Sequence, residues 1–406
     1  MKLVFLLALR SLSRNSRRTA ISLCTVAFGV SALIIAGGFV DALLLKLRED
    51  TIHSQLGHIQ ISDARQGEAG AKDPFAHLLP TSPAAMAPVA AAAGVRMITP
   101  RLAISGLVSV GETTLSFSGQ GVDPAREADL AQGIAVIAGT RLQPGDEAAA
   151  VLGEGLAASL AVKPGDTVAL LVTAANGTFN ATDVVVRGVF STVSKSHDDV
   201  ALRLPLATAQ KLLRVEGAQQ WLVLLDDTDA TGDALRRLRG ALPAERYAMT
   251  RWDEDADFYH KTAELFARQF GFVRVIVLAI IVLSILNTMT MNVLERTREI
   301  GVMLALGDSR RRVLALFACE GTLLGLVGAA GGAALGIAAA GALSAVGIPM
   351  PPPPGMNHGF DIGIALSPPL VAMAAAIGAA AAAAAAVPPA LRGARLPVVD
   401  ALRAVN

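Results

Sequence analysis

Cysteine is nearly absent from this sequence, since only Cys24 and Cys319 occur among its 406 residues. Both fall within long apolar stretches, so the polar part of the chain has no disulfide available to it. That polar part covers residues 46–269 and is long enough to bury a sizeable hydrophobic core without cross-links. The sequence therefore predicts a polar domain that is held together by packing alone.

A strong charge of either sign is also missing. Lysine and arginine together number 35, aspartate and glutamate 34, and the formal net charge is +1. Binding to nucleic acid requires a basic field that neutralises phosphates, so no nucleic acid partner is expected. The chain contains no Gly-Lys pair, and therefore no phosphate-binding loop of the form Gly-x-x-x-x-Gly-Lys-Ser/Thr.

Residues that could carry catalysis or hold a metal are few. His53 and His58 are not spaced to stack on one face of a helix, and no acidic partner for them is obvious. The run 194–199, Ser-Lys-Ser-His-Asp-Asp, contains the residue types of a hydrolase, but a catalytic triad is assembled from distant segments. We expect a non-catalytic chain that itself binds no metal and no cofactor.

Apolar residues, in contrast, are abundant. They make up 53% of the chain, and the mean hydropathy is +0.51. They gather in four stretches, each long enough for a helix that crosses the roughly 30 Å hydrocarbon core of a membrane. The predicted spans are residues 19–45, 270–293, 313–346 and 368–388.

The distribution of positive charge predicts the orientation of these spans. Arginines are concentrated before the first span, between the second and third, and after the fourth, as Arg10, Arg14, Arg17, Arg18, Arg296, Arg298, Arg310, Arg311, Arg312, Arg392, Arg395 and Arg403. Because such residues mark cytoplasmic segments, both termini, the 294–312 connection and the 389–406 tail are expected in the cytoplasm. Residues 46–269 and the 347–367 loop are then expected outside. This arrangement, with no exported cysteine, fits a multi-pass protein of a bacterial inner membrane.

Residues 1–18 are predicted to form an amphipathic helix on the cytoplasmic surface. Phe5, Leu9 and Leu12 share one face of that helix, and Arg10 and Arg14 lie on the opposite face. This helix serves either as an orientation signal or as a contact for a specific partner, and the sequence alone leaves both interpretations open.

The polar segment 46–269 mixes short strands with helices. Alternating patterns between turn signals predict strands at 57–61, 106–110, 168–173 and 183–189, and helices are predicted at 153–160, 206–213 and 233–242. Residues 255–268 are polar but compatible with a helix that continues into the second span. The expected fold class is a multi-pass α-helical membrane protein, with four spans in a 1+3 order and a large extracytoplasmic α+β domain of one or two subdomains.

The third span carries glycines at intervals of three or four residues, namely Gly321, Gly325, Gly328, Gly332 and Gly336. Small residues at this spacing allow the backbones of neighbouring helices to approach closely. The fourth span is nearly all alanine from Ala372 to Ala386 and is expected to pack against its neighbours. We therefore predict tight packing around the third span.

The connection 294–312 has the most specific pattern in the chain. Its Glu-Arg-Thr-Arg-Glu-Ile-Gly core begins at Glu295 and is followed by apolar residues and by Gly307, which is expected to end a short helix. An ordinary solvated loop accounts for the arginines but not for the interleaved glutamates and apolar residues. A helix that docks on a cytoplasmic partner accounts for all of them.

This core, with the Ala-Leu-Gly that follows, resembles the signature of the FtsX-like permease family, the four-span membrane subunits of mechanotransmission-class ABC transporters. The tail around Leu396-Pro397 and exterior matches such as Pro164-Gly165-Asp166 are similar to those of lipoprotein-releasing permeases in particular. The resemblance implies that the connection docks on a separate cytoplasmic ABC ATPase, which binds the ATP and magnesium. The residues that it places at or near this contact are Glu295, Arg296, Arg298, Glu299, Ile300 and Gly301.

The resemblance also implies a function and further partners. The chain would pair with a second permease copy or paralogue, and nucleotide-driven movement of the outer domain would extract or release lipoprotein or another hydrophobic cargo from membrane lipids. A periplasmic carrier or adaptor would take part. Two alternatives stay open: a drug or peptide efflux permease that works with a periplasmic adaptor, and a non-transport regulator of cell-wall hydrolases.

Overall fold

A computed structural model describes residues 16–66, 73–130, 134–192, 194–350 and 359–397. The described residues form two compact units. The helix unit comprises those within Met1–Leu43, Ala263–Pro349 and Asp361–Asn406, and the sheet unit comprises those within Leu44–Thr262 and Met350–Phe360. The predicted amphipathic helix over 1–18 lies outside the described residues except for its last three, which belong to the first long helix.

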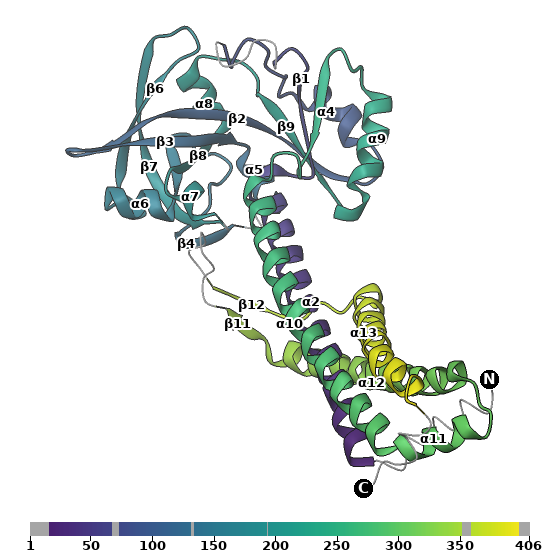
Figure 1. The fold of residues 1–406 in the computed structure, drawn as a ribbon. Coiled ribbons are helices and arrows are strands. Elements are labelled where there is room, and N and C mark those ends of the chain that lie inside the picture. The colour runs from purple at the N-terminus through teal and green to yellow at the C-terminus, as the bar shows by residue number, and fades with distance from the viewer. Residues whose placement is uncertain (1–15, 67–72, 131–133, 193, 351–358, 398–406) are drawn as a thin grey trace. The chain divides into compact units, whose positions relative to one another are not determined.

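The helices are α2 (Ser16–Thr51), α10 (Asp257–Glu295), α11 (Thr297–Ala305), α12 (Arg310–Val346) and α13 (Pro368–Ala394), as Figure 1 shows. Within the described residues, four of them, α2, α10, α12 and α13, are long and apolar enough to cross a membrane. Each predicted span lies inside one of these helices. The expected fold class, four spans in a 1+3 order around an α+β domain, is confirmed.

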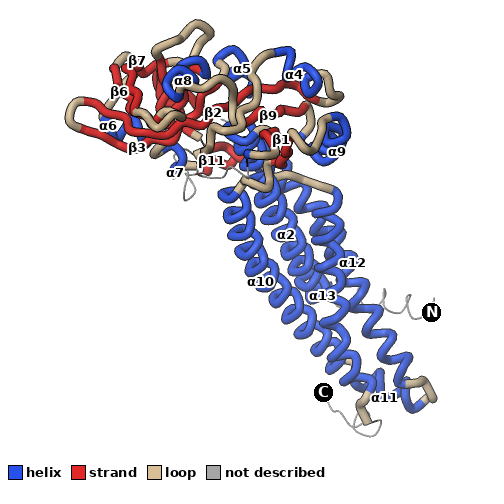
Figure 2. Tube along the Cα trace, turned by 90° about the horizontal axis from the view of Figure 1, so that it is seen from above, coloured by secondary structure: helices blue, strands red, loops and turns tan. Residues whose placement is uncertain are grey.

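The long helices run side by side in the helix unit (Figure 2), and small residues set their separation. A Cβ atom added at Gly321 or Gly325 would clash with α13, at Ala386 and at the Ala379 carbonyl oxygen respectively. A Cβ added at Gly328, Gly332 or Gly336 would instead lie against α2. The five predicted packing glycines thus face two different helices, so α12 lies between α2 and the alanine-rich α13.

α10 is one uninterrupted helix from Asp257 to Glu295, as predicted for residues 255–268. It begins within the sheet unit and continues through the helix unit, and α2 is shared between the two units in the same way. The connection between α12 and α13 contains a two-stranded sheet of β11 (Ile348–Met350) and β12 (Phe360–Ile362).

The sheet unit is built on one ten-stranded sheet. Its strands are β1 (Ile59–Asp63), β2 (Val95–Val110), β3 (Thr113–Val122), β4 (Ala135–Gly139), β5 (Ala149–Gly153), β6 (Thr167–Thr173), β7 (Phe179–Ser191), β8 (Ala201–Pro205), β9 (Gln220–Leu225) and β10 (Tyr247–Arg251). Its short helices are η1 (Ile52–Leu56), α4 (Pro83–Ala90), α5 (Pro124–Leu130), α6 (Glu154–Leu160), α7 (Lys195–Asp198), α8 (Leu206–Leu213), η4 (Thr228–Ala230) and α9 (Thr231–Ala241). Every strand and helix predicted in this part of the chain lies on or overlaps one of these elements.

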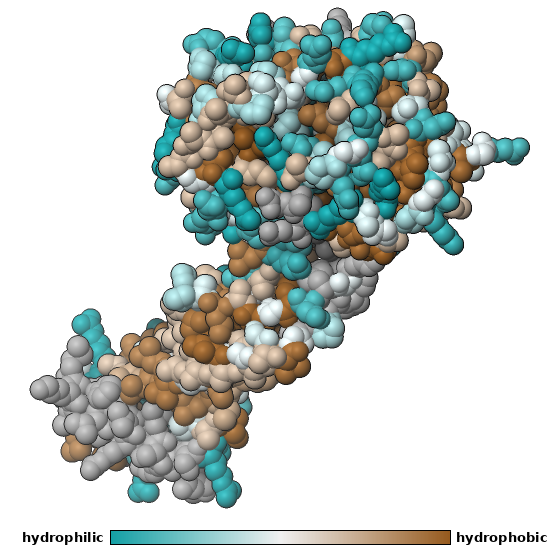
Figure 3. Space-filling view, turned by 180° about the vertical axis from the view of Figure 1, so that it is seen from behind, coloured by the Kyte–Doolittle hydropathy of each residue, from teal (hydrophilic) through white to brown (hydrophobic). Residues whose placement is uncertain are grey.

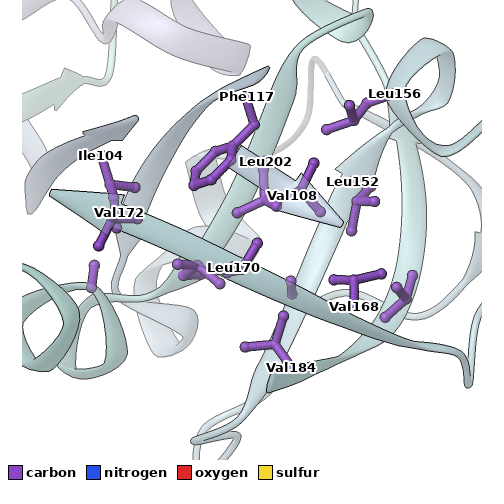
Figure 4. Close-up of a cluster of buried hydrophobic side chains, with 14 of the residues drawn as sticks. Ile104, Val108, Phe117, Leu152, Leu156, Val168, Leu170, Val172, Val184 and Leu202 are labelled. Atoms are coloured by element: carbon purple, nitrogen blue, oxygen red, sulfur yellow. The ribbon is translucent and has the colours of Figure 1, made fainter. Parts of the chain in front are cut away.

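Six of the strands close on themselves. β2 pairs with β3, β3 with β8, β8 with β5, β5 with β7, β7 with β6, and β6 again with β2. We call this closed set the strand ring. Side chains such as Val108, Phe117, Leu152, Leu170 and Val184 point toward one another and form its core (Figure 4). Closure leaves these strands with few unpaired edges, while β4 remains an edge strand beside β7.

The first half of β2 leaves the ring and joins a four-stranded extension in the order β10-β1-β9-β2. One face of the extension packs against α4 and α9 through residues such as Met86, Trp221 and Leu235. The opposite face packs against Ile52, Leu130 and Trp252. Figure 3 shows polar side chains over much of the visible surface of the sheet unit and hydrophobic side chains over much of that of the helix unit, which fits an aqueous and a membrane environment respectively.

Candidate functional site

The predicted docking segment is a helix–kink–helix. α10 ends at Glu295, Arg296 has non-helical backbone angles (φ −104°, ψ 11°), and α11 begins at Thr297. α11 stops at Ala305, and Gly307 follows in the left-handed region with φ +95°, which glycine adopts without steric cost. The chain thus turns sharply between α10 and α12, and α11 forms a short separate helix at this turn.

One side of α11 is fixed to the helix unit. Ile300 is only 2% exposed and packs in a cluster with Val293, Phe317 and Ala390, which come from α10, α12 and α13. Gly301 is buried as well. Because the apolar face of α11 contacts all three neighbouring helices, α11 is held rigidly rather than displayed as a loose loop.

An ion pair reinforces this attachment. The guanidinium of Arg296 lies 3.6 Å (Nη1) from the Oε2 of Glu320, a residue of α12 that is almost fully buried. The Nδ2 of Asn292 in α10 lies 3.5 Å from the other carboxylate oxygen of Glu320. Arg296 also pairs with Glu299, with 3.3 Å between Nε and Oε2. A buried carboxylate in an apolar helix is costly unless it is paired, and here the pairing joins α12 to the kink before α11.

The opposite side of α11 is exposed and combines charge with apolar surface. Glu295, Arg298, Glu299, Val302 and Leu306 all lie on it, and we call these residues the docking face. Leu306 is 85% exposed and Val302 43% exposed. Glu295 is partly engaged by an exposed ion pair with Arg18 of α2. A cavity of about 110 Å³ lies next to this face, lined by Arg296, Glu299, Ile300, Met303, Val313, Leu316 and Phe317.

The structure thus separates the six predicted contact residues into two groups. Glu295, Arg298 and Glu299 are exposed, whereas Arg296, Ile300 and Gly301 are directed into the helix unit and position the segment. The prediction omitted Leu306 from the contact set, although an apolar residue just before the stop signal Gly307 was a usable indication. It treated Glu320 as a boundary residue likely to pair between helices, and the structure identifies Arg296 as its partner.

A second feature of the helix unit is a groove between α2 and α10. Its volume is about 500 Å³, and it is lined almost entirely by apolar residues, which are Phe28, Ala32, Ile35, Ala36, Phe39 and Val40 of α2 and Phe266, Phe270 and Val273 of α10, with Ser31, Gln269 and Ile364. Phe28 is 77% exposed. A groove of this kind suits a hydrocarbon chain better than a polar solute.

No metal centre is found among the described residues, where no three His, Cys, Asp or Glu side chains lie close enough to hold an ion. His53 and His58 are neighbours in the sheet unit, with ring centroids 5.8 Å apart. His58 uses both ring nitrogens within the protein, accepting from the Leu225 N–H at 3.1 Å and contacting the Thr228 hydroxyl at 2.9 Å. The chemistry of these histidines is therefore structural.

Two protein-family models match the chain. The MacB-like periplasmic core domain matches residues 19–241, more than half of the chain, and the FtsX-like permease C-terminal matches residues 271–398. The second match includes α11 and the whole docking face. The first includes α2 and most of the sheet unit.

Curated relatives agree with these matches. An uncharacterised ABC transporter permease of Methanocaldococcus jannaschii is 28% identical over 172 residues, which cover 40% of this chain and 42% of that protein. The macrolide export ATP-binding/permease protein MacB of Chromobacterium violaceum is 29% identical over 210 residues, 49% of this chain and 30% of that protein. The pyoverdine export ATP-binding/permease protein PvdT of Pseudomonas putida is 30% identical over 142 residues, 35% and 20% respectively. The chain spans less than half the length of these relatives.

Proposed function

Because this chain belongs to the FtsX-like permeases of ABC transporters, with a MacB-like periplasmic core domain, we propose that it converts ATP hydrolysis by a separate cytoplasmic ATPase into movement of the sheet unit. In this proposal the chain is a non-catalytic membrane subunit. Its sheet unit lies outside a bacterial inner membrane, both termini lie in the cytoplasm, and a second permease copy or paralogue completes the transporter.

The observation that carries this proposal is the docking face. Exposed Leu306 and Val302 lie beside Arg298 and Glu299, while the other side of α11 is fixed to α10, α12 and α13. An apolar anchor surrounded by charges is a typical protein contact, in which the anchor supplies affinity and the charges supply specificity. A rigid mounting is what a force-transmitting contact requires.

Two helices supply the mechanical route. α10 is continuous over 39 residues, and α2 over 36 residues. Both take part in the helix unit and in the sheet unit. A displacement imposed at the docking face on α10 is therefore carried into the sheet unit without an intervening flexible loop.

The cargo proposed here is hydrophobic. The groove between α2 and α10 is apolar and has a volume of about 500 Å³, comparable with sites that hold small lipophilic ligands. Release or extraction of lipoprotein from the membrane, with a periplasmic carrier as acceptor, fits an acyl chain in that groove. This cargo is the finer part of the proposal.

Drug or peptide efflux with a periplasmic adaptor is the second candidate, and it is favoured by the names of two relatives, which export a macrolide and pyoverdine. Regulation of a cell-wall hydrolase is the third. Purification of the full-length chain from its host membranes distinguishes the three. Bound lipoprotein and its carrier support the first, a copurified adaptor the second, and a wall hydrolase the third.

The docking face is tested by two substitutions, Arg298→Glu and Leu306→Asp, in the tagged full-length chain expressed with each candidate ATPase of its host. We expect binding of one ATPase to weaken about 30-fold for Leu306→Asp, because loss of an anchoring side chain costs about 2 kcal/mol. Arg310→Glu, which reverses an exposed charge at the start of α12, is the matched control and should bind normally. If no ATPase binds the wild-type chain, or if both variants bind it as well as the wild type does, the proposal is wrong.

A further inference from the structure

Three charged side chains are buried together in the sheet unit. Arg101 on β2 is 1% exposed, Glu127 on α5 is 7% exposed, and Arg203 on β8 is 4% exposed. The Nη2 of Arg101 lies 2.8 Å from the Oε2 of Glu127, and Arg203 makes a short ion pair with the other carboxylate oxygen. Glu127 is therefore held between two guanidinium groups, and we call these three residues the charged clamp.

The clamp lies where the strand ring and the four-stranded extension meet. Arg101 is opposite Gln220 on β9, at the last pair that joins β2 to the extension. Leu102 is the next residue of β2 and the first to pair with β3 of the ring. Arg203 belongs to β8, a ring strand that pairs with β3. Glu127 therefore links one residue at the end of the extension with one residue of the ring.

The clamp also holds the end of a membrane helix. The Nη2 of Arg203 donates to the backbone carbonyl oxygen of Ser54 at 2.5 Å. Ser54 is in η1, the π-helical turn that follows α2 directly. Ile52 of the same turn packs with Leu130 of α5 and with Trp252, just before α10. The last turns of α2 are thus fixed to the sheet by an apolar contact and by a charged one.

The charges favour their ionised forms in this environment. Burial opposes the ionisation of Glu127, but Arg101 and Arg203 outweigh it and hold the pKa of Glu127 below its ordinary value. Burial lowers the pKa of Arg203 to about 10, which still leaves it protonated at neutral pH. The hydrogen bonds from Arg203 are therefore charge-assisted and directional.

Stability alone does not explain such a cluster. Buried ion pairs can often be replaced by apolar side chains of similar volume with little loss, because removing charges from water is costly. What apolar side chains do not reproduce is the geometry, since only a donor at position 203 can bond the Ser54 carbonyl oxygen while also holding Glu127.

We propose that Arg203, Glu127 and Arg101 are positioning residues for transport, which fasten the end of α2 to both halves of the sheet so that movement of this helix is transmitted to the whole sheet unit. This inference rests on the proposed function for its role in transport. The attachment itself is a property of the chain alone and is testable without a partner.

The first test compares amide hydrogen exchange in full-length protein in nanodiscs. In Arg203→Met, we expect peptides that cover residues 47–58 to exchange at least 10-fold faster than in the wild type, while the core strands of the ring keep their protection. Arg187→Met is the matched control, because it breaks an exposed pair with Asp146 in the same unit (2.8 Å; Arg187 side chain 50% exposed). Exchange of residues 47–58 within twofold of the wild type in Arg203→Met would overturn the inference.

A second variant covers the case in which Arg203→Met fails to fold. The triple substitution Arg101→Met, Glu127→Leu, Arg203→Met removes all three charges and leaves no buried ion unpaired. We expect it to fold, as judged by tryptophan fluorescence, and yet to keep the fast exchange of residues 47–58. Wild-type protection in this variant would mean that the clamp only fills space, and the inference would be wrong.

The third test uses the complex with the ATPase. In the wild type, ATP should change the exchange pattern of the sheet unit; in the triple variant, ATP hydrolysis should continue and this change should be lost. A nucleotide-dependent change that survives in the triple variant contradicts the role in transport. If the wild type itself shows no change with ATP, the proposed function is what fails, and the first two tests still decide whether the clamp holds α2.

Discussion

At the scale of single residues, the separation of the membrane helices depends on individual hydrogen atoms. The backbone of α12 approaches α2 so closely at Gly332 that an added Cβ would lie 2.5 Å from the carbonyl oxygen of Ala27. The neighbouring Gly331 faces open space, with no atom within 4 Å of the added Cβ. The two glycines differ by one position along one helix, so the packing alone distinguishes them.

We predict that Gly332→Ala destabilises the helix unit by about 1–3 kcal/mol, the usual cost of overpacking against atoms that do not move aside. The loss would occur although alanine is the better helix former by about 1 kcal/mol. Gly331→Ala gains the same propensity without the clash and should be neutral or stabilising. Unfolding in detergent, followed by circular dichroism, measures both. Equal stability of the two variants would contradict the close contact between α12 and α2.

At the scale of elements, α11 is held by side chains with very different surroundings. Arg296 pairs with Glu320, whose side chain is 2% exposed, and with Glu299, whose side chain is 53% exposed. An exposed pair contributes less than about 1 kcal/mol because water and salt screen it, whereas a hydrogen bond to a buried charge contributes about 1.5–3 kcal/mol. The buried partner should therefore determine how rigidly α11 is mounted.

Glu320→Gln is accordingly expected to destabilise the helix unit by about 2 kcal/mol and to accelerate amide exchange throughout α11. Glu299→Gln, which alters the other partner of the same arginine, should change stability by less than about 1 kcal/mol. A double-mutant cycle with Arg296→Met isolates the pairwise energies. A larger coupling energy for Glu299 than for Glu320 would show that the mounting of α11 does not depend on the buried pair.

At the scale of the whole molecule, the two units can be followed separately. The chain has two tryptophans, Trp221 and Trp252, and both are buried in the sheet unit. Tryptophan fluorescence of the full-length protein therefore reports the folding of the sheet unit, while the helix unit dominates the helical signal in circular dichroism.

The sheet unit is predicted to lose stability in mild acid. Burial, aided by His53 and Arg48 and opposed by Asp227, lowers the pKa of His58 to about 4. In the unfolded chain this pKa is about 6.5, so between these values only the unfolded chain binds the proton. Stability is then complete above pH 6.5 and falls as the pH drops toward 4, by about 3 kcal/mol for this group. The measurement is the unfolding midpoint by tryptophan fluorescence as a function of pH.

The control for this pH dependence is a pair of histidine variants. His58→Gln cannot titrate and should show a shallower decline between pH 6.5 and 4 than the wild type. His260→Gln alters an exposed histidine of the same unit and should follow the wild type. If His58→Gln and the wild type decline in parallel, His58 is not the group responsible.

Much of the candidate site followed from local sequence. The Glu-Arg-Thr-Arg-Glu-Ile-Gly core located the docking segment, and Gly307 marked its end. The direction of each side chain did not follow, because the kink at Arg296 rotates α11 relative to α10. That rotation turns Arg296 and Ile300 inward and leaves Leu306 exposed.

What the sequence by itself determined are the features with a local, repeating signal: four apolar helices, a polar insert, a glycine-spaced third span and a charged connection between the second and third spans. Only the tertiary structure decided the closure of the six-strand ring and the meeting of Arg101, Glu127 and Arg203. Helices are written in periodic patterns along the chain, whereas strand pairing and buried charge clusters join residues up to a hundred positions apart. Their partners are selected by burial and by hydrogen-bond geometry, neither of which exists before the chain has folded.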